Sequence, residues 1–222
     1  MHVVVNAATS ADGKLSSRDR SQVAISGAED FERVDELRAS VDAVMVGVGT
    51  VLADDPSLTV KADDRVLERE ARGDSPQPAR VVADSRARTP PDAAVVDDSA
   101  RTYVLVASDA PADRRARLTT DTTDVVEAGS ERADLAAGLD ALEARGVDDV
   151  MVEGGGELLF SLFDAGLVDE LTVYVGSTLI GGRDAPTLVD GDGFTPPDFV
   201  DLALEDVERI DDGVLLAYDV EN

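Results

Sequence analysis

Cysteine is absent from the 222-residue sequence, and the one histidine is His2, beside the N-terminus. A chain without cysteine forms no disulfide, no thiolate metal site and no cysteine nucleophile. A single histidine at the chain end argues against a histidine general base, a histidine-based triad and a histidine-rich zinc site. The sequence therefore predicts chemistry that depends on carboxylates, hydroxyls, backbone groups or a cofactor, with no metal site.

Long apolar runs are missing as well. Charged residues interrupt every apolar stretch before it reaches the roughly 20 residues that a membrane-spanning helix needs. The opening MHVVVNAATSADGK has no basic start followed by a long apolar segment, so we expect no signal peptide. We therefore expect a cytoplasmic protein with no membrane partner.

Positive charge is scarce, since 20 basic residues face 47 acidic ones and the formal net charge is −27. The acids are spread along the whole chain. We interpret them as the solvated surface of a protein from a high-salt cytoplasm, where screening removes most of the self-repulsion. The alternative is an acidic protein that docks on a basic partner. No basic stripe is present, so we expect no nucleic-acid partner.

The apolar pattern predicts alternating strands and helices. We expect strands at 3–5, 41–47, 57–60, 80–83, 102–107, 124–128, 149–152 and 170–175, and helices at 29–40, 111–118, 131–145 and 156–165. Residues 62–78 are polar and end in proline, which predicts a long excursion or a short exposed helix. Residues 199–209 and 213–220 alternate polar and apolar side chains, as an antiparallel hairpin does. This order predicts one α/β domain, residues 1–222, with a mixed central sheet and flanking helices.

The segment VMVEGGGELLF, from Val150, joins a buried strand to an amphipathic helix through three glycines. Glycine lets a backbone approach a ligand, and the first N–H groups of a helix lie at its positive end. We interpret this turn as a phosphate cradle. The alternative is a tight strand-to-helix turn, although one or two glycines would suffice for that. Glu153 ends its strand at the edge where α/β sheets bind ligands, or it accepts backbone hydrogen bonds there.

The segment GVGTVLADDPSLTVK runs from Gly47 to Lys61. Thr50 begins a short helix and places a hydroxyl where it can contact a ligand. Asp55 precedes Pro56, which predicts an extended conformation for Asp55. The chain then resumes as a strand that delivers Lys61. A loop that only connects two elements is the alternative.

Two further stretches are unusually basic for so acidic a chain. Lys14, Arg18 and Arg20 lie within seven residues, which either an anionic ligand or ion pairs with neighbouring acids would explain. In VVADSRAR, a strand ends near Arg86 and Arg88. These arginines either reach the 2′-phosphate of a dinucleotide or belong to an ordinary turn.

Taken together, ATSADGK, GVGTVLADDPSLTVK, VVADS, VEGGGELLFSLFDAGLVDEL and YVGSTLIGG resemble the signature motifs of the riboflavin-pathway pyrimidine reductases. The resemblance covers roughly residues 3–220. This family includes the C-terminal reductase domain of the bacterial bifunctional deaminase-reductase and stand-alone archaeal enzymes. The resemblance implies a dihydrofolate-reductase-like fold, a homodimer and NADPH as cofactor, with NADH as the alternative.

The implied reaction reduces the ribosylamino side chain of 2,5-diamino-6-ribosylamino-4(3H)-pyrimidinone 5′-phosphate to the ribitylamino form, by hydride transfer to C1′ of the opened sugar. The chain has no H-x-E…P-C-x-x-C deaminase motif. Its absence favours the archaeal type, whose substrate is not yet deaminated. The alternatives are the same reduction of the deaminated pyrimidine and a dihydrofolate-type reductase.

The resemblance also assigns residues by their match to the family's motifs. The implied cofactor contacts are Ala8, Val23, Thr50, Asp54, Ser85, Gly154, Gly155, Gly156, Glu157 and Leu158. The implied substrate contacts are Ser21, Arg38, Leu58, Lys61 and Glu153. Ring opening needs proton movement, and with histidine excluded Glu153 and Asp54 are the catalytic candidates. We expect Lys14, Arg38 and Lys61 to supply the counter-charge for the 5′-phosphate.

Overall fold

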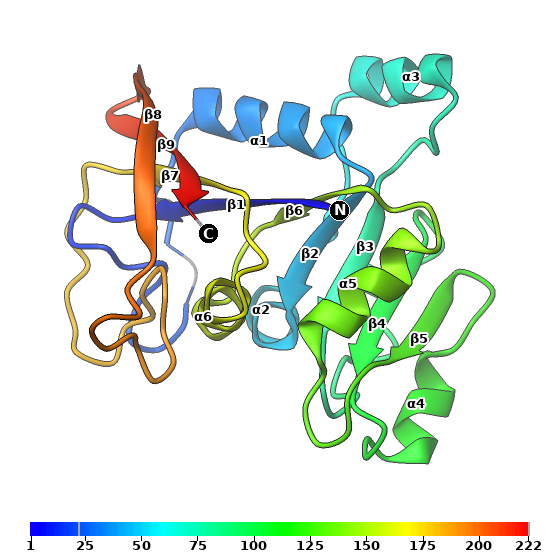
Figure 1. Cartoon of the computed structure of the whole chain (residues 1–222). Helices are drawn as coiled ribbons and strands as arrows, with labels where there is room; N and C mark the ends of the chain where they lie inside the picture. The colour runs from blue at the N-terminus through cyan, green and yellow to red at the C-terminus, as the bar shows by residue number, and fades with distance from the viewer. Residues whose placement is uncertain (22, 222) are drawn as a thin grey trace. The chain divides into compact units, whose positions relative to one another are not determined.

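A computed structural model describes residues 1–21 and 23–221 of the chain (Figure 1). The chain folds into two compact units. Unit 1 consists of Met1 and Asp35–Met151, and unit 2 consists of His2–Val34 and Val152–Asn222. The single domain expected from the sequence stays a prediction, and each unit is described by itself.

Unit 1 is built on a sheet whose strands, in spatial order, are β5 (Thr123–Glu127), β4 (Thr102–Val106), β3 (Ala79–Ala83), β2 (Ala43–Gly47) and β6 (Asp149–Val152). Strands β2 to β5 pair in parallel. Most of their β-branched side chains are buried, as in parallel sheets that are covered on both faces. Gly47 pairs with Ala83, and Ala83 with Leu105, so the carboxyl ends of β2, β3 and β4 lie at one edge.

The helices of unit 1 are α2 (Val48–Asp54), α3 (Asp63–Arg72), α4 (Ala112–Leu118) and α5 (Leu135–Glu143), with a short 3-10 turn η1 (Ala94–Val96). Helix α1 (Ala28–Ser40) passes from unit 2 into unit 1 at Asp35. Helix α3 shows that the polar segment after Lys61 is a short helix. Helix α5 is shorter than predicted because Asp134 caps its start, accepting the N–H of Ala137 at 3.0 Å. No helix among the described residues is both long and apolar enough to cross a membrane.

The strand predicted at 57–60 is wrong, and Asp55 is not extended. Asp55 ends α2 in the left-handed conformation (φ 42°), and Leu58 also has a positive φ of 52°. The N–H of Asp55 donates to the carbonyl of Val51, and its carboxylate accepts the N–H of Ala94 at 2.7 Å. These bonds hold Asp55 in a helix-ending turn, and they outweigh the preference that Pro56 imposes on its neighbour.

Unit 2 contains strands β1 (His2–Thr9), β7 (Glu170–Val175), β9 (Gly213–Glu221) and β8 (Asp201–Ile210), in that spatial order. Strands β1 and β7 are parallel, whereas β7, β9 and β8 are antiparallel. Helix α6 (Gly156–Asp164) buries Leu158, Leu159, Leu162 and Phe163. The predicted C-terminal hairpin is confirmed, as is the α/β class with a mixed sheet and flanking helices.

Candidate functional site

Thr50 and Asp54 both lie on α2, which follows directly from the carboxyl end of β2. Thr50 is half-buried near the start of the helix, and Asp54 is largely exposed at its end. Although much of Asp54 meets solvent, desolvation by burial raises the pKa of its carboxyl group. A carboxyl group with a raised pKa carries a proton closer to neutral pH, which suits the predicted catalytic role of Asp54.

Ser85 follows β3 at the same sheet edge, and its hydroxyl accepts the backbone N–H of Ala133 at 2.9 Å. The neighbouring Asp84 is fully buried and accepts the N–H of Thr89 at 2.7 Å and its hydroxyl at 2.8 Å. The Nε of Arg88 lies 3.8 Å from the other oxygen of Asp84. These contacts place Arg88 in a turn and leave Arg86 exposed, and the cofactor role of Ser85 stays a prediction.

Arg38, Leu58 and Lys61 are brought together in unit 1, around residues 57–62, which we call the cationic loop. Leu58 is buried at 1% exposure and anchors the loop. The guanidinium of Arg38, on α1, donates to the carbonyl of Thr59 at 3.1 Å. The ammonium of Lys61 donates to the hydroxyls of Ser57 at 2.6 Å and Thr59 at 2.8 Å. These hydroxyl partners are neutral, so they do not cancel the charge of Lys61.

Asp35, which the sequence reasoning missed, holds the end of the cationic loop. It is 7% exposed, and one carboxylate oxygen accepts the N–H of Lys61 at 2.6 Å. The other oxygen accepts the N–H of Ala62 at 3.1 Å and a guanidinium N–H of Arg65 at 3.2 Å. A signal was available, because Asp35 and Arg38 are three residues apart on a predicted helix and therefore share one face.

The three consecutive glycines of unit 2 serve different purposes. Gly154 and Gly155 have φ values of 138° and 99°, which favour glycine. A Cβ at Gly156 would come within 2.6 Å of the Thr187 carbonyl and 2.7 Å of the Asp190 carboxylate. A Cβ at Gly154 would meet no heavy atom of the described chain within 4 Å. Packing therefore requires Gly156, whereas the space beside Gly154 remains available to a ligand.

The start of α6 provides hydrogen-bond donors. Gly155 is the N-cap and has no side-chain acceptor, and the first intrahelical bond runs from Leu159 to the carbonyl of Gly155. The N–H groups of Gly156, Glu157 and Leu158 precede that bond and therefore have no acceptor in the helical ladder. Such N–H groups at the positive end of a helix suit the phosphates of a dinucleotide.

The other predicted residues of unit 2 are spread over several elements. Ala8 is half-buried on β1, and Glu153 is half-buried directly after β6. Ser21 is exposed in a turn in which its N–H donates to the Ser17 hydroxyl at 3.1 Å. Val23 is half-buried beyond that turn. Their shared role in a site stays a prediction.

The carboxylate of Asp12 stabilises the turn that follows β1. Asp12 accepts the N–H groups of Ile180 at 2.9 Å and Gly181 at 2.8 Å, and the hydroxyl of Ser10 at 2.7 Å. The bond from Ile180, followed by the bond from Ser10, lowers the pKa of Asp12 to about 2. Asp12 therefore joins the N-terminal turn to the 180–181 segment.

Lys14 is also tied into unit 2. Its ammonium donates to the carbonyl of Ala185 at 3.2 Å, and its backbone forms an isolated bridge with Thr187. Lys14 belongs to unit 2, whereas Arg38 and Lys61 belong to unit 1. The predicted grouping of these three cations around one phosphate stays a prediction.

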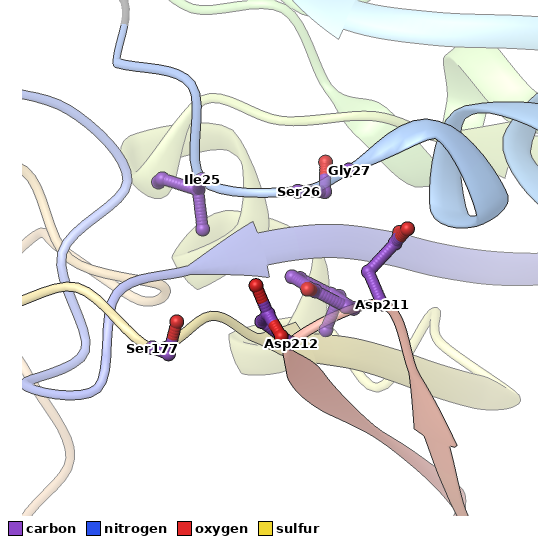
Figure 2. A pocket seen from close by; sticks show the side chains of 7 residues that line it. Ile25, Ser26, Gly27, Ser177, Asp211 and Asp212 are labelled. Atoms are coloured by element: carbon purple, nitrogen blue, oxygen red, sulfur yellow. The ribbon is translucent and has the colours of Figure 1, made fainter.

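A cavity of about 420 Å³ in unit 2 contains none of the predicted site residues (Figure 2). It is lined by Ile25, Ser26, Gly27, Tyr174, Ser177, Asp211 and Asp212. The carboxylate of Asp211 accepts the N–H groups of Glu29 at 3.2 Å and Asp30 at 3.1 Å, which caps the start of α1. An acidic lining is unsuited to a phosphate, so this cavity is not a candidate for the substrate phosphate.

Known proteins resemble this chain in sequence and in structure. A protein of Archaeoglobus fulgidus named 2,5-diamino-6-ribosylamino-4(3H)-pyrimidinone 5′-phosphate reductase is 47% identical over 212 residues, covering 96% of this chain and 94% of that protein. A pyrimidine reductase-like protein from Corynebacterium diphtheriae matches with a TM-score of 0.85 at 20% identity, covering 100% of this chain and 92% of that chain.

A dihydrofolate reductase from Enterococcus faecalis matches with a TM-score of 0.50 at 11% identity, covering 100% of this chain and 97% of that chain. At such identities the two structures bear on the fold alone, and they confirm the dihydrofolate-reductase-like architecture. The family model described as the RibD C-terminal domain matches residues 1–216. Because that match spans nearly the whole sequence, the chain belongs to the RibD C-terminal domain family.

Proposed function

We propose that this chain reduces 2,5-diamino-6-ribosylamino-4(3H)-pyrimidinone 5′-phosphate to its ribitylamino form in riboflavin biosynthesis. The observation that carries this conclusion is the 47% identity, over 96% of the chain, to the Archaeoglobus fulgidus protein of that name. The cationic loop adds physical support, because its ammonium and the neighbouring guanidinium suit a substrate that carries a phosphate.

The cofactor that we propose is NADPH, with NADH as the alternative. The space beside Gly154 and the N–H groups that begin α6 suit the pyrophosphate of a dinucleotide. Thr50 and Ser85 follow neighbouring parallel strands at their carboxyl ends, the edge where such sheets bind ligands. Arg86 is exposed and would pair with a 2′-phosphate. When bound, the cofactor supplies the hydride that reduces C1′ of the opened sugar.

The protein's own residues position the substrate and transfer one proton. Lys61 and Arg38 bind the 5′-phosphate, and the buried Leu58 holds the loop that carries Lys61. The match to the family's motifs also assigns Ser21 and Glu153 to the substrate. The product gains two hydrogens, one as hydride and one as a proton. Asp54 and Glu153 are the proposed proton carriers, and desolvation by burial raises the pKa of the Asp54 carboxyl group.

We also propose a homodimer that forms through one face of β8 and β9. Paired residues of antiparallel strands share a face, and on this face all of them except Arg209 are apolar. The face consists of Leu202, Leu204, Val207, Val214, Leu216, Tyr218 and Val220, together with Arg209, which pairs with Val214 at one end. Leu204 and Val207 are each 55% exposed, whereas Leu171 and Val173, on the same face of the adjacent β7, are buried. The apolar face is therefore covered by the protein at β7 and open to solvent at β8.

A second copy is the occupant that fits this face. A twofold dimer places the same patch on itself, so an apolar face meets an apolar face. The remaining surface of a chain with net charge −27 repels a second copy. The β8–β9 face is the place where two copies can meet without opposing rows of acids.

The environment that we propose is a high-salt cytoplasm. Molar salt reduces the Debye length to about 3 Å, which screens most of the repulsion among the acids. The supporting observation is that 47 acids are distributed over the whole chain rather than in one tail. Thermal unfolding should occur at a higher temperature in molar KCl than in dilute buffer, and a melting temperature independent of salt would contradict this proposal.

The decisive experiment is a turnover assay in molar KCl with the diaminopyrimidinone ribosylamine 5′-phosphate and NADPH. Cofactor oxidation and product mass are followed together. A product heavier by two hydrogens establishes the reaction. The deaminated pyrimidine and dihydrofolate serve as the competing substrates, and turnover of either one alone would replace the proposed function with that alternative.

A further inference from the structure

We infer that Asp35 is a positioning residue of the phosphate-binding site, which sets the place of Lys61 without touching the substrate. This inference rests on the proposed function of the cationic loop. Its basis is the set of three bonds that the buried carboxylate accepts, two from the backbone N–H groups of Lys61 and Ala62 and one from Arg65.

The cationic loop needs such an anchor because none of the strands that the structure describes pairs with it. Residues 57–62 form no regular structure, and Leu58 is in the left-handed region. An exposed lysine on an irregular loop would sample many positions, and ordering it on binding would weaken the affinity for the substrate. Asp35 fixes the backbone at Lys61 itself, at a distance of 2.6 Å.

The position of Asp35 in the sequence also links the two cations of the proposed site. Asp35 and Arg38 lie on the same helix, three residues apart, and both bind the cationic loop. Asp35 holds it at Lys61, and Arg38 holds it at Thr59. The ammonium and the guanidinium are therefore set relative to one another by a single rigid element, α1.

A carboxylate is well suited to position Lys61. The charge of Asp35 is matched by Arg65 at 3.2 Å, while the ammonium of Lys61 rests on two neutral hydroxyls. The local excess of positive charge that a phosphate requires is therefore kept. An asparagine would retain one acceptor oxygen and would place N–H groups against those of Ala62 and Arg65.

The test compares Asp35→Asn with wild type in the turnover assay. We expect the KM for the pyrimidine phosphate to rise about tenfold or more, the size of effect that hydrogen bonds to a charged group produce. The KM for NADPH and kcat should stay within about twofold of wild type. Inorganic phosphate, used as a competitive inhibitor, should bind correspondingly more weakly. An unchanged KM for the pyrimidine phosphate would overturn the inference.

Two controls separate positioning from loss of stability. Asp30→Asn changes another buried carboxylate of α1, one that pairs with Arg33 at 2.8 Å, and it should lower the melting temperature without altering the substrate KM. In a Lys61→Ala background, Asp35→Asn should add little to the rise in KM, because both changes act through one ammonium. Full additivity of the two changes would mean that Asp35 does not act through Lys61.

Hydrogen exchange of the wild-type protein gives a test that needs no variant. The amides of Lys61 and Ala62 should exchange slowly, and more slowly still when inorganic phosphate is added. Exchange at the rate of an unstructured peptide would overturn the inference. If wild type turned over no pyrimidine phosphate while these amides were protected, the proposed function would fail and the anchoring role of Asp35 would stand.

Discussion

The side-chain amide of Gln77 binds both backbone groups of Val60. The N–H of Val60 donates to Oε1 of Gln77 at 2.7 Å, and Nε2 of Gln77 donates to the Val60 carbonyl at 3.1 Å. One side chain thus satisfies the two groups that a neighbouring strand would otherwise bind. The cationic loop is held by this amide on one side and by Asp35 on the other.

Gln77→Leu should therefore loosen the loop. Val60 is buried, so removing both partners leaves its N–H and carbonyl unsatisfied, at a cost of about 1–3 kcal/mol for each group. Chemical denaturation of wild type and variant measures this loss. Ser75→Ala, on the exposed segment just before Gln77, is the control, and a Gln77→Leu protein as stable as that control would contradict the prediction.

Lys61→Ala should weaken binding of the pyrimidine phosphate by about 10- to 100-fold in kcat/KM, which corresponds to roughly 1.5–3 kcal/mol for a hydrogen bond to a charged group. Steady-state kinetics measures this change, with the KM for NADPH as internal control. Lys61→Arg keeps the charge and should retain most of the activity. Equal losses in the two variants would show that geometry, and not charge, is what Lys61 contributes.

Stability at low pH should depend on Asp12. Its folded-state pKa of about 2 lies below the ordinary 3.8, so the carboxylate form is bound more favourably in the folded protein. This contribution is complete above 3.8 and is lost as the pH falls towards about 2. Wild type should therefore be more stable than Asp12→Asn at neutral pH, and the difference should shrink as the pH falls through about 2. A difference in unfolding free energy that does not change with pH would refute this assignment.

Two Gly→Ala substitutions should change the stability of the protein in opposite directions. Gly156→Ala places a methyl group 2.6 Å from the Thr187 carbonyl and should destabilise the protein by about 1–3 kcal/mol. Gly49→Ala lies within α2, where a Cβ meets no described atom within 4 Å, and should stabilise it by about 0.5–1 kcal/mol. Thermal melts of the two variants check the signs, and destabilisation by both would mean that the start of α2 does not tolerate a methyl group.

Leu204→Glu should prevent dimer formation. The substitution places a carboxylate in the middle of the apolar β8–β9 face, where a second copy would bring the same charge opposite it. Light scattering after size-exclusion chromatography in molar KCl should give a dimer for wild type and a monomer for the variant. Asp206→Asn, on the opposite face of β8, is the control. A variant that stays dimeric would place the interface elsewhere.

The sequence was sufficient for the fold because the parallel strands of unit 1 are apolar runs rich in β-branched residues, such as Val44–Val46, between turn residues. It was insufficient for residues 57–60, whose alternating pattern resembles a strand. Whether such a segment becomes a strand depends on a partner with available backbone groups. Here Gln77, seventeen residues away, takes that place, and no local pattern predicts a bond between a side chain and a distant backbone.

The site was predictable only in part, for a related reason. Arg38 and Lys61 are named by their match to the family's motifs, and the structure places both against the cationic loop. Asp35 was not predicted because it positions other groups of the protein and takes no part in the reaction itself. Its spacing from Arg38 indicated a shared helix face, but nothing in the sequence of so acidic a chain indicates that the carboxylate of Asp35 is buried.

The cationic loop is held by side-chain hydrogen bonds and by the buried Leu58, and not by strand pairing. Substitutions at Asp35, Arg38 or Gln77 can move the ammonium of Lys61 while every strand pairing of unit 1 stays intact. An engineer who wishes to accommodate a longer or shorter sugar phosphate thus has three adjustable anchors on a fixed scaffold. The same independence would let substrate preference diverge among relatives that keep one fold.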